Sequence, residues 1–280
     1  MKDVQNSIGN FLFKIDNVGI DSFTHPISIK TRDGICFNTI ADFSLSVSLE
    51  KDIRGINMSR LPIFLSELNK DGWYLDDIKG NLKKLRSKLE SKDAKIAVEF
   101  VYFIKKEAPL SKYKSYMNYR CKFETSIVEN MNDASSEYDA VLTVEVPITA
   151  LCPCSKEISE YSAHNQRGYV SVSVRYNKTV WIEEIIDIVE SVASCEIYPI
   201  LKRVDEKYVT EKAYDNPRFV EDIVRLTAER LSKDNRINWF NVKSRHMESI
   251  HRHNAFAEIT YSKILKKQLI DSTFDLKGET

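Results

Sequence analysis

The stretches LTVEVPI (residues 142–148) and VSVSVRY (170–176) decide the fold, because apolar and polar side chains alternate through both. A period of two predicts strands with one apolar face. The segment after them carries apolar residues at helical spacing: Ile182, Ile185, Ile186, Val189 and Val192. Asn216-Pro217, a capping residue followed by proline, predicts the start of a second helix. Alternation returns at 237–244 and 255–261, which we predict to be strands.

The first half of the chain repeats this order of elements. Its predicted elements are strands at 26–30 and 43–49, helices at 61–68 and 78–89, and strands at 96–102 and 117–123. Asp71-Gly72 marks the turn between the helices, and the polar segment 129–138 is predicted to connect the halves. We therefore predict an α+β fold of two tandem modules, residues 1–135 and 136–280. Each has the order strand-strand-helix-helix-strand-strand, with an antiparallel sheet and its helices on one face. Free sheet edges favour closure into oligomeric barrels.

The composition predicts a globular cytoplasmic protein. Apolar residues make up 42% of the 280, which is enough for a sizeable core, and 41 basic residues balance 41 acidic ones. A net charge of zero gives no reason to expect nucleic acid or a membrane as partner. No signal core or membrane-length apolar stretch is visible. Five cysteines in a reducing compartment favour free thiols. Cys36, Cys121 and Cys195 stand alone, whereas Cys152 and Cys154 lie together.

The densest chemical cluster is LCPCSKEIS (151–159), followed by AHNQR (163–167), in the connection between two predicted strands. The Cys152 thiolate and the His164 imidazole could share a metal ion or form a nucleophile and its base. The cysteine spacing is not that of a zinc finger and no second pair exists, which disfavours a structural zinc site. Two small buried thiols and a surface histidine explain the spacing equally well.

A second cluster, HMESIHRHN (246–254), lies between the last two predicted strands and holds three of the five histidines. In an extended segment His251 and His253 share a face. Together with Glu248 they could supply a metal ligand and a general acid or base. The alternative is a solvated hairpin loop.

Two carboxylates look unremarkable by themselves. Glu206 lies in the charged segment KRVDEK (202–207), which we expect to be a linker. Glu221 lies near the start of a predicted helix, where the helix dipole favours a negative charge. No glycine-rich phosphate loop is present, so any triphosphate would need side-chain cations. The cations near the motifs are Lys156, Arg167, Lys202, Arg203 and Lys207.

These motifs resemble those of the GTP cyclohydrolase I type IB family. The resemblance continues through three further stretches and an opening Asp3-Val4-Gln5: LKRVDEKYVTE (201–211), NPRFVED (216–222) and ESIHRHNA (248–255). It covers most of the second half, whereas the first half matches mainly by element order. It implies the tunnelling fold, with two modules per chain, and a homotetramer. The implied reaction converts GTP and water to 7,8-dihydroneopterin triphosphate and formate, the entry to folate-type pterins, with a divalent metal such as zinc or manganese.

The resemblance also assigns roles to residues. Cys152 matches the metal-associated catalytic cysteine, with Cys154 as second choice. Glu221 matches the carboxylate that anchors the purine, and Glu248 and His251 match the acid/base group. The resemblance implies a metal site formed by Cys152, His164, Glu206 and His251. It implies a catalytic set of Cys152, His164, His251 and Glu248. The implied substrate-binding cations are Arg167 and Lys156. A bound metal would supply the water nucleophile for attack at the guanine ring.

Two other functions fit part of the pattern. One is a tunnelling-fold relative such as the nitrile reductase of the queuosine route, which pairs a cysteine with a nicotinamide cofactor. The other is a non-catalytic module that binds a purine or a metal. The Cys-Pro-Cys motif together with His164 and His251 favours the cyclohydrolase.

Overall fold

The structure is a computed structural model that describes residues 8–68, 78–129 and 136–263 of the 280-residue chain. The Asp3-Val4-Gln5 motif and the predicted Asp71-Gly72 turn lie outside the described residues. Contacts between Cα atoms divide the chain into two compact units. Unit 1 comprises Met1–Val101 with Cys121–Leu142, and unit 2 comprises Tyr102–Arg120 with Thr143–Thr280. The module boundary at residue 135 concerns sequence order and stays a prediction.

Unit 1 is a sheet with two helices. Its elements are β1 (Ile15–Lys30), β2 (Cys36–Leu49), α1 (Arg60–Leu68), α2 (Ile78–Lys88) and parts of β3 (Asp93–Glu107), β4 (Lys114–Glu129) and β5 (Ser136–Leu151). The strand order is β1-β2-β3-β4-β5. Alternate residues of β2, such as Phe43 and Leu45, are fully buried, as are Leu61 of α1 and Leu82 of α2. The predicted alternation and helical spacing therefore mark the core of this unit.

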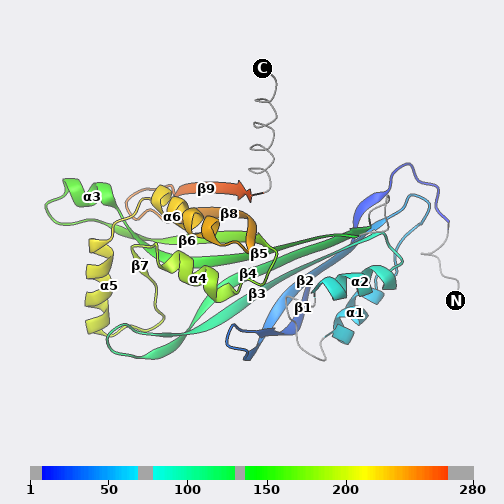
Figure 1. Cartoon of the computed structure of the whole chain (residues 1–280), viewed down its shortest axis with the longest axis horizontal. Helices are drawn as coiled ribbons and strands as arrows, with labels where there is room; N and C mark the ends of the chain where they lie inside the picture. Colours follow the sequence, from blue (N-terminus) through cyan, green and yellow to red (C-terminus); the bar gives the residue numbers. More distant parts are fainter. Residues whose placement is uncertain (1–7, 69–77, 130–135, 264–280) are drawn as a thin grey trace, which may run out of the picture. The chain divides into compact units, whose positions relative to one another are not determined.

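Unit 2 contains the remaining parts of β3, β4 and β5 and all later elements. These are α3 (Pro153–Ile158), β6 (Asn165–Tyr176), α4 (Ile182–Glu190), β7 (Cys195–Glu196), α5 (Arg203–Asp215), α6 (Val220–Lys233), β8 (Ile237–His246) and β9 (Ala255–Ser262). The strand order is β3-β4-β5-β6-β8-β9, and β7 pairs with β5. Figure 1 shows α3 and the β8–β9 connection at the same end of this unit, with α5 close by.

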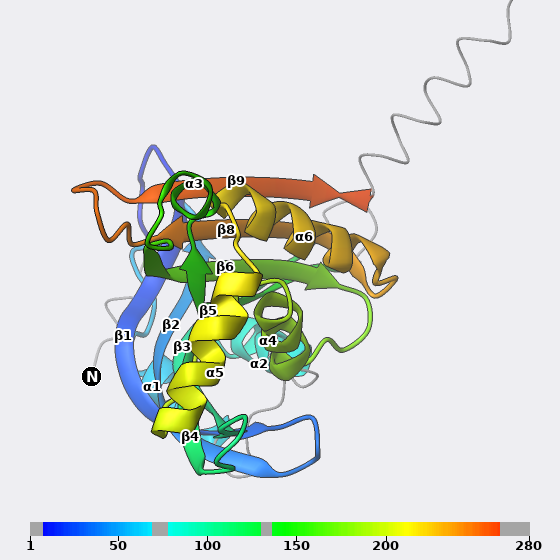
Figure 2. The same cartoon turned by 90° about the vertical axis from the view of Figure 1, so that its left-hand side faces the viewer.

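The two faces of β6 and β8 differ in character. Residues such as Val172 and Val242, which are paired in the register, are completely buried. Ile185 of α4 and Ile223 of α6 are also buried, and Figure 2 shows α6 running alongside β8 and β9. Because side chains alternate along a strand, the intervening residues point away from these helices. The predicted α+β fold with antiparallel pairing and helices against one face is confirmed.

The segment 202–207 was predicted to be a linker, but Lys202 caps the 13-residue helix α5 and residues 203–207 form its first part. Only Asp205 and Ala213 of this helix are buried, so it shows no apolar period. Its start is fixed instead by the Asp205 carboxylate, which accepts a hydrogen bond from Lys202 N at 2.8 Å. Asn216 ends α5 rather than capping the next helix, and α6 begins after Phe219. Within the described residues, no helix has the length and apolar character needed to cross a bilayer.

Candidate functional site

The Cys152 loop is closed at its base by the backbone. Cys152 N donates a hydrogen bond to His164 O at 3.1 Å, so the two predicted residues are neighbours although twelve positions separate them. The Cys152 sulfur caps α3 and accepts from Ser155 N at 3.4 Å. Pro153 stands in the first turn of that helix. Cys152 is half-buried, whereas Cys154 is exposed.

The loop after β8 lies against the Cys152 loop. His164 Nδ1 is 3.0 Å from Ser249 Oγ, and Gln166 Nε2 donates to Glu248 Oε1 at 3.3 Å. The rings of His251 and His253 stack with centroids 5.0 Å apart, which confirms that they share a side. The structure thus joins the two motif clusters, which are separated by about 80 residues in sequence, at one end of unit 2.

The remaining predicted residues occupy different positions. Glu221 lies in the first turn of α6, where its charge acts on His246 at the end of β8. Glu206 lies in the first turn of α5 and is exposed. Lys156 points to α5. Its Nζ donates a hydrogen bond to the backbone carbonyl oxygen of Tyr214 at 2.6 Å and lies 4.2 Å from the centroid of the Tyr214 ring. Arg167 lines a cavity on the other face of β6.

His246 is a buried residue of this region to which the sequence assigned no role. Its side chain is 2% exposed, and its Nε2 has no hydrogen-bond partner among the described residues. Gly168, its register partner on β6, makes room for the ring. A Cβ at residue 168 would lie 2.9 Å from His246 Cδ2 and 3.0 Å from Ile148 Cγ1. Burial lowers the pKa of His246 to about 4, partly opposed by the charge of Glu221. The imidazole is therefore neutral at neutral pH.

Gln166 offers a second unpaired polar atom on the same buried face. Its residue is 8% exposed, and its Oε1 finds no partner within the described part of the chain. Buried polar atoms in proteins are nearly always hydrogen-bonded. The sequence shows Gln166 within the motif between His164 and Gly168. It does not show that the side chain is buried, because that depends on the register of β6 with β8.

The cysteines outside the motif are poor candidates for chemistry. Cys195 is buried, and burial together with the neighbouring Glu196 charge raises the pKa of its thiol to about 12. A protonated thiol is neither a nucleophile nor a metal ligand. Cys121 is also buried, and Cys36 is exposed.

The predicted metal ligands do not form a complete site in the described part of one chain. No three side chains of His, Cys, Asp or Glu converge there to hold an ion. Cys152, His164 and His251 lie in the two joined loops, whereas Glu206 lies on α5.

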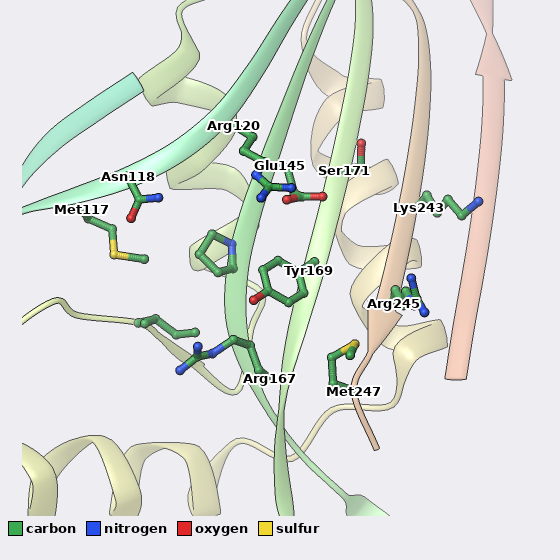
Figure 3. A pocket seen from close by; sticks show the side chains of 12 residues that line it. Met117, Asn118, Arg120, Glu145, Arg167, Tyr169, Ser171, Lys243, Arg245 and Met247 are labelled. Atoms are coloured by element: carbon green, nitrogen blue, oxygen red, sulfur yellow. The ribbon is translucent and has the colours of Figure 1, made fainter. Parts of the chain in front are cut away.

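A cavity of about 600 Å³ lies on the face of unit 2 that carries the outward side chains of β6 and β8. Figure 3 shows Tyr169 and Glu145 near its centre, with basic side chains around them. The basic residues of the lining are Arg120, Arg167, Lys243 and Arg245. Arg167 and Met247 both line the cavity and are linked by a hydrogen bond from Met247 N to Arg167 O at 2.9 Å. The cavity therefore begins where the two loops meet.

The strand order with its covering helices defines a tunnelling-fold protein. The urate oxidase of Bacillus sp. TB-90 superposes with a TM-score of 0.54, 11% identity and coverage of 89% of this chain and 100% of that one. The urate oxidase of Bacillus subtilis 168 gives 0.53 and 10%, covering 89% and 99%. At this identity the likeness concerns the fold alone.

Sequence relatives are more specific. The family described as type I GTP cyclohydrolase folE2 matches residues 1–257. GTP cyclohydrolase FolE2 of Magnetococcus marinus is 45% identical over 92% of this chain and 95% of its own. The protein of the same name from Geotalea uraniireducens is 42% identical over 99% of both. The chain belongs to the FolE2 family of type I GTP cyclohydrolases, and the resemblance seen in the motifs is confirmed.

Proposed function

We propose that this chain is a GTP cyclohydrolase that opens the imidazole ring of GTP to give 7,8-dihydroneopterin triphosphate and formate, the first step of folate synthesis. The observation that carries the proposal is the joining of the two loops. Cys152 and His164 share a backbone hydrogen bond, and His164 reaches the Glu248–His251 loop through Ser249. The loops that carry the thiol, the imidazoles and the carboxylate thus lie against each other in a chain of the FolE2 family.

The residues divide the work by their chemistry. Glu221 accepts hydrogen bonds from guanine N1–H and the 2-amino group, a donor pair that adenine lacks, so that adenine is rejected. His164, His251 and Glu248 exchange protons with the departing nitrogen and the water that attacks. Cys152 is the catalytic thiol, with Cys154 as second choice. Arg167 and Lys156 remain the proposed substrate cations. Lys156 would first have to release the Tyr214 carbonyl.

The metal and the assembly belong to the same proposal. We expect a divalent ion, zinc or manganese, bound by Cys152, His164, His251 and Glu206 of a cytoplasmic homotetramer in which more than one copy completes the site. The two loops support an assembly because they expose apolar side chains: Ile158 is 83% exposed, Tyr161 94% and Ile250 64%. Exposed apolar side chains grouped around a site are typical of interfaces. In addition, β9 is the last strand of the described sheet, so its outer edge has no partner strand there and could pair with another copy.

The test is to incubate the purified protein with GTP, after removal of metal and after addition of manganese or zinc. Pterin fluorescence and released formate are then measured. We expect product only with metal added back. GTP binding without product would favour the binding module, and consumption of NADPH with a nitrile substrate would favour the reductase. Full activity in the stripped protein would refute the metal part alone.

Glu221→Gln tests the guanine contact in the same protein. The amide replaces one acceptor oxygen with a donor that faces a guanine donor. An unsatisfied buried polar group costs about 1–3 kcal/mol, so GTP affinity should fall roughly tenfold or more. Glu229→Gln is the matched control, because Glu229 lies on the same helix and its carboxylate forms an ion pair with Lys233 at the surface. Unchanged GTP affinity in Glu221→Gln would remove this residue from the site.

A further inference from the structure

We propose that the cavity on the outward face of β6 and β8 is a polyphosphate-binding site in which Arg120 and Arg167 hold the anion. The anion is the triphosphate of the nucleotide substrate or a free polyphosphate of the same chemistry. The first source rests on the function proposed above, whereas the second does not.

The lining of the cavity is predominantly basic. Four cations from three strands face the cavity, Arg120 from β4, Arg167 from β6, and Lys243 with Arg245 from β8. Glu145 of β5 is the single carboxylate in the lining, so the lining carries a net charge of three positive. A concave surface lined by one sign of charge concentrates the potential. Over the whole chain the net charge is zero, so this concentration is local.

Two of these four cations have side-chain partners and two have none among the described residues. Lys243 faces Glu258, with Nζ 3.8 Å from its carboxylate. Arg245 donates to the side-chain oxygen of Asn254 from Nε at 3.2 Å and from a terminal nitrogen at 2.7 Å, with the amide turned to accept. By contrast, no ion pair or side-chain hydrogen bond engages the guanidinium groups of Arg120 and Arg167 among the described residues. Two free planar guanidinium groups at one cavity match the geometry of phosphate oxygens.

The cavity lies next to the two candidate loops, which favours the triphosphate of the substrate as the anion. Arg167 follows Gln166 directly, and Gln166 binds Glu248 of the candidate catalytic loop. Met247, which borders the cavity, precedes Glu248 in the same way. Arg167 lies on the face of β6 opposite Gln166, so a nucleotide whose base is at the loops would reach it with its phosphates around the strand end where Met247 N donates to Arg167 O. Figure 3 shows Arg167 and Met247 at the same end of the cavity.

Two variants of opposite sign test the site. Arg120→Ala removes a cation from a strand that carries none of the proposed catalytic residues, and Glu145→Gln removes the only carboxylate of the lining. Lys233→Ala is the control, because it removes one exposed cation of unit 2 outside the lining. Calorimetry on the full chain would measure affinity for GTP, guanosine and tripolyphosphate. Circular dichroism and guanosine affinity report whether each variant is folded.

We expect Arg120→Ala to weaken GTP binding roughly tenfold or more and to leave guanosine binding unchanged, whereas Glu145→Gln should strengthen GTP binding. Tripolyphosphate should compete with GTP. If it binds in an Arg120-dependent manner without competing, the site stands and its ligand is a free polyphosphate. If the protein forms no pterin but keeps this binding, the proposed function fails and the site stands. If folded Arg120→Ala and Glu145→Gln bind both anions as the unchanged protein does, the proposal is overturned.

Discussion

The buried imidazole of His246 should make the protein less stable as the pH falls below neutrality. Its ring is 2% exposed, packs onto Gly168 and has an unpaired Nε2 among the described residues. Burial penalises the charged form, which lowers the pKa of His246 to about 4 from the ordinary histidine value of 6.5. The informative perturbation is a change of pH from 7 to 5, applied to the unchanged protein and to His246→Asn.

The sign and size follow from proton linkage. Between pH 6.5 and about 4 the unfolded chain binds a proton at this ring and the folded chain does not, so the free energy of unfolding falls as the pH falls. The contribution is fully present above pH 6.5 and is lost toward the folded pKa. One pKa unit corresponds to about 1.4 kcal/mol. The loss should therefore be about 2 kcal/mol at pH 5 and about 3 kcal/mol in all.

Urea unfolding followed by circular dichroism, at one protein concentration, would give the free energies at both pH values. His246→Asn should be less stable at pH 7 but should lose about 2 kcal/mol less between pH 7 and 5. His253→Asn, which removes an exposed ring, should keep the full loss. The ring nitrogens of His246, followed by NMR, give the pKa directly even if the variant unfolds. A His246 ring that titrates near 6.5 in the folded protein would refute the reasoning.

Three further variants address the site and its support. Cys152→Ala should lose pterin formation by at least ~100-fold, an order typical of a group that stabilises the transition state, while Cys195→Ala, whose thiol is buried and protonated, should stay active; an equal loss in folded Cys195→Ala would contradict the assignment. Gly168→Ala should destabilise the protein by about 1–3 kcal/mol in urea, because the new Cβ overlaps the His246 ring, and an unchanged midpoint would argue against that packing. Asp205→Asn should lower the melting temperature, because the buried Asp205 carboxylate accepts hydrogen bonds from three backbone N–H groups and the variant removes its charge. An unchanged melting temperature would mean that the Asp205 carboxylate does not stabilise the start of α5.

The parts of the fold that the sequence predicted are those in which one face is buried. From Ala41 to Leu49 in β2 and from Gln166 to Val174 in β6 every second residue is buried, so the apolar period of two is visible without the structure. The helix α5 was missed for the opposite reason. It buries only two of its 13 residues and is anchored by the Asp205 carboxylate, an interaction that leaves no periodic pattern. The six-residue helix α3 is too short to show any period.

The sequence predicts the two motifs of the candidate site but not that they lie against each other. Their contact depends on the pairing of β6 with β8, which sets Gly168 opposite His246 and brings the ends of both strands together. The sequence pattern ends β8 at Ser244, because the alternation of apolar residues stops there. The structure continues it to His246, with Ser244 and His246 on the buried face. Polar residues at buried positions hide a strand from a pattern based on hydrophobicity.

Those hidden polar positions are themselves informative about function. Five buried side-chain oxygen or nitrogen atoms lack a partner in the described residues, and three of them belong to Gln166, Ser244 and His246, on the helix-facing side of β6 and β8. Apolar side chains at these positions would avoid the penalty of unpaired polar atoms. Cations occupy the opposite face of the same strand ends, with Arg167 and Arg245 at the cavity. Both faces therefore give up core stability or charge balance at the one end where the Cys152 and Glu248 loops meet. This common location is what we expect if the substrate proposed above binds at that end of unit 2.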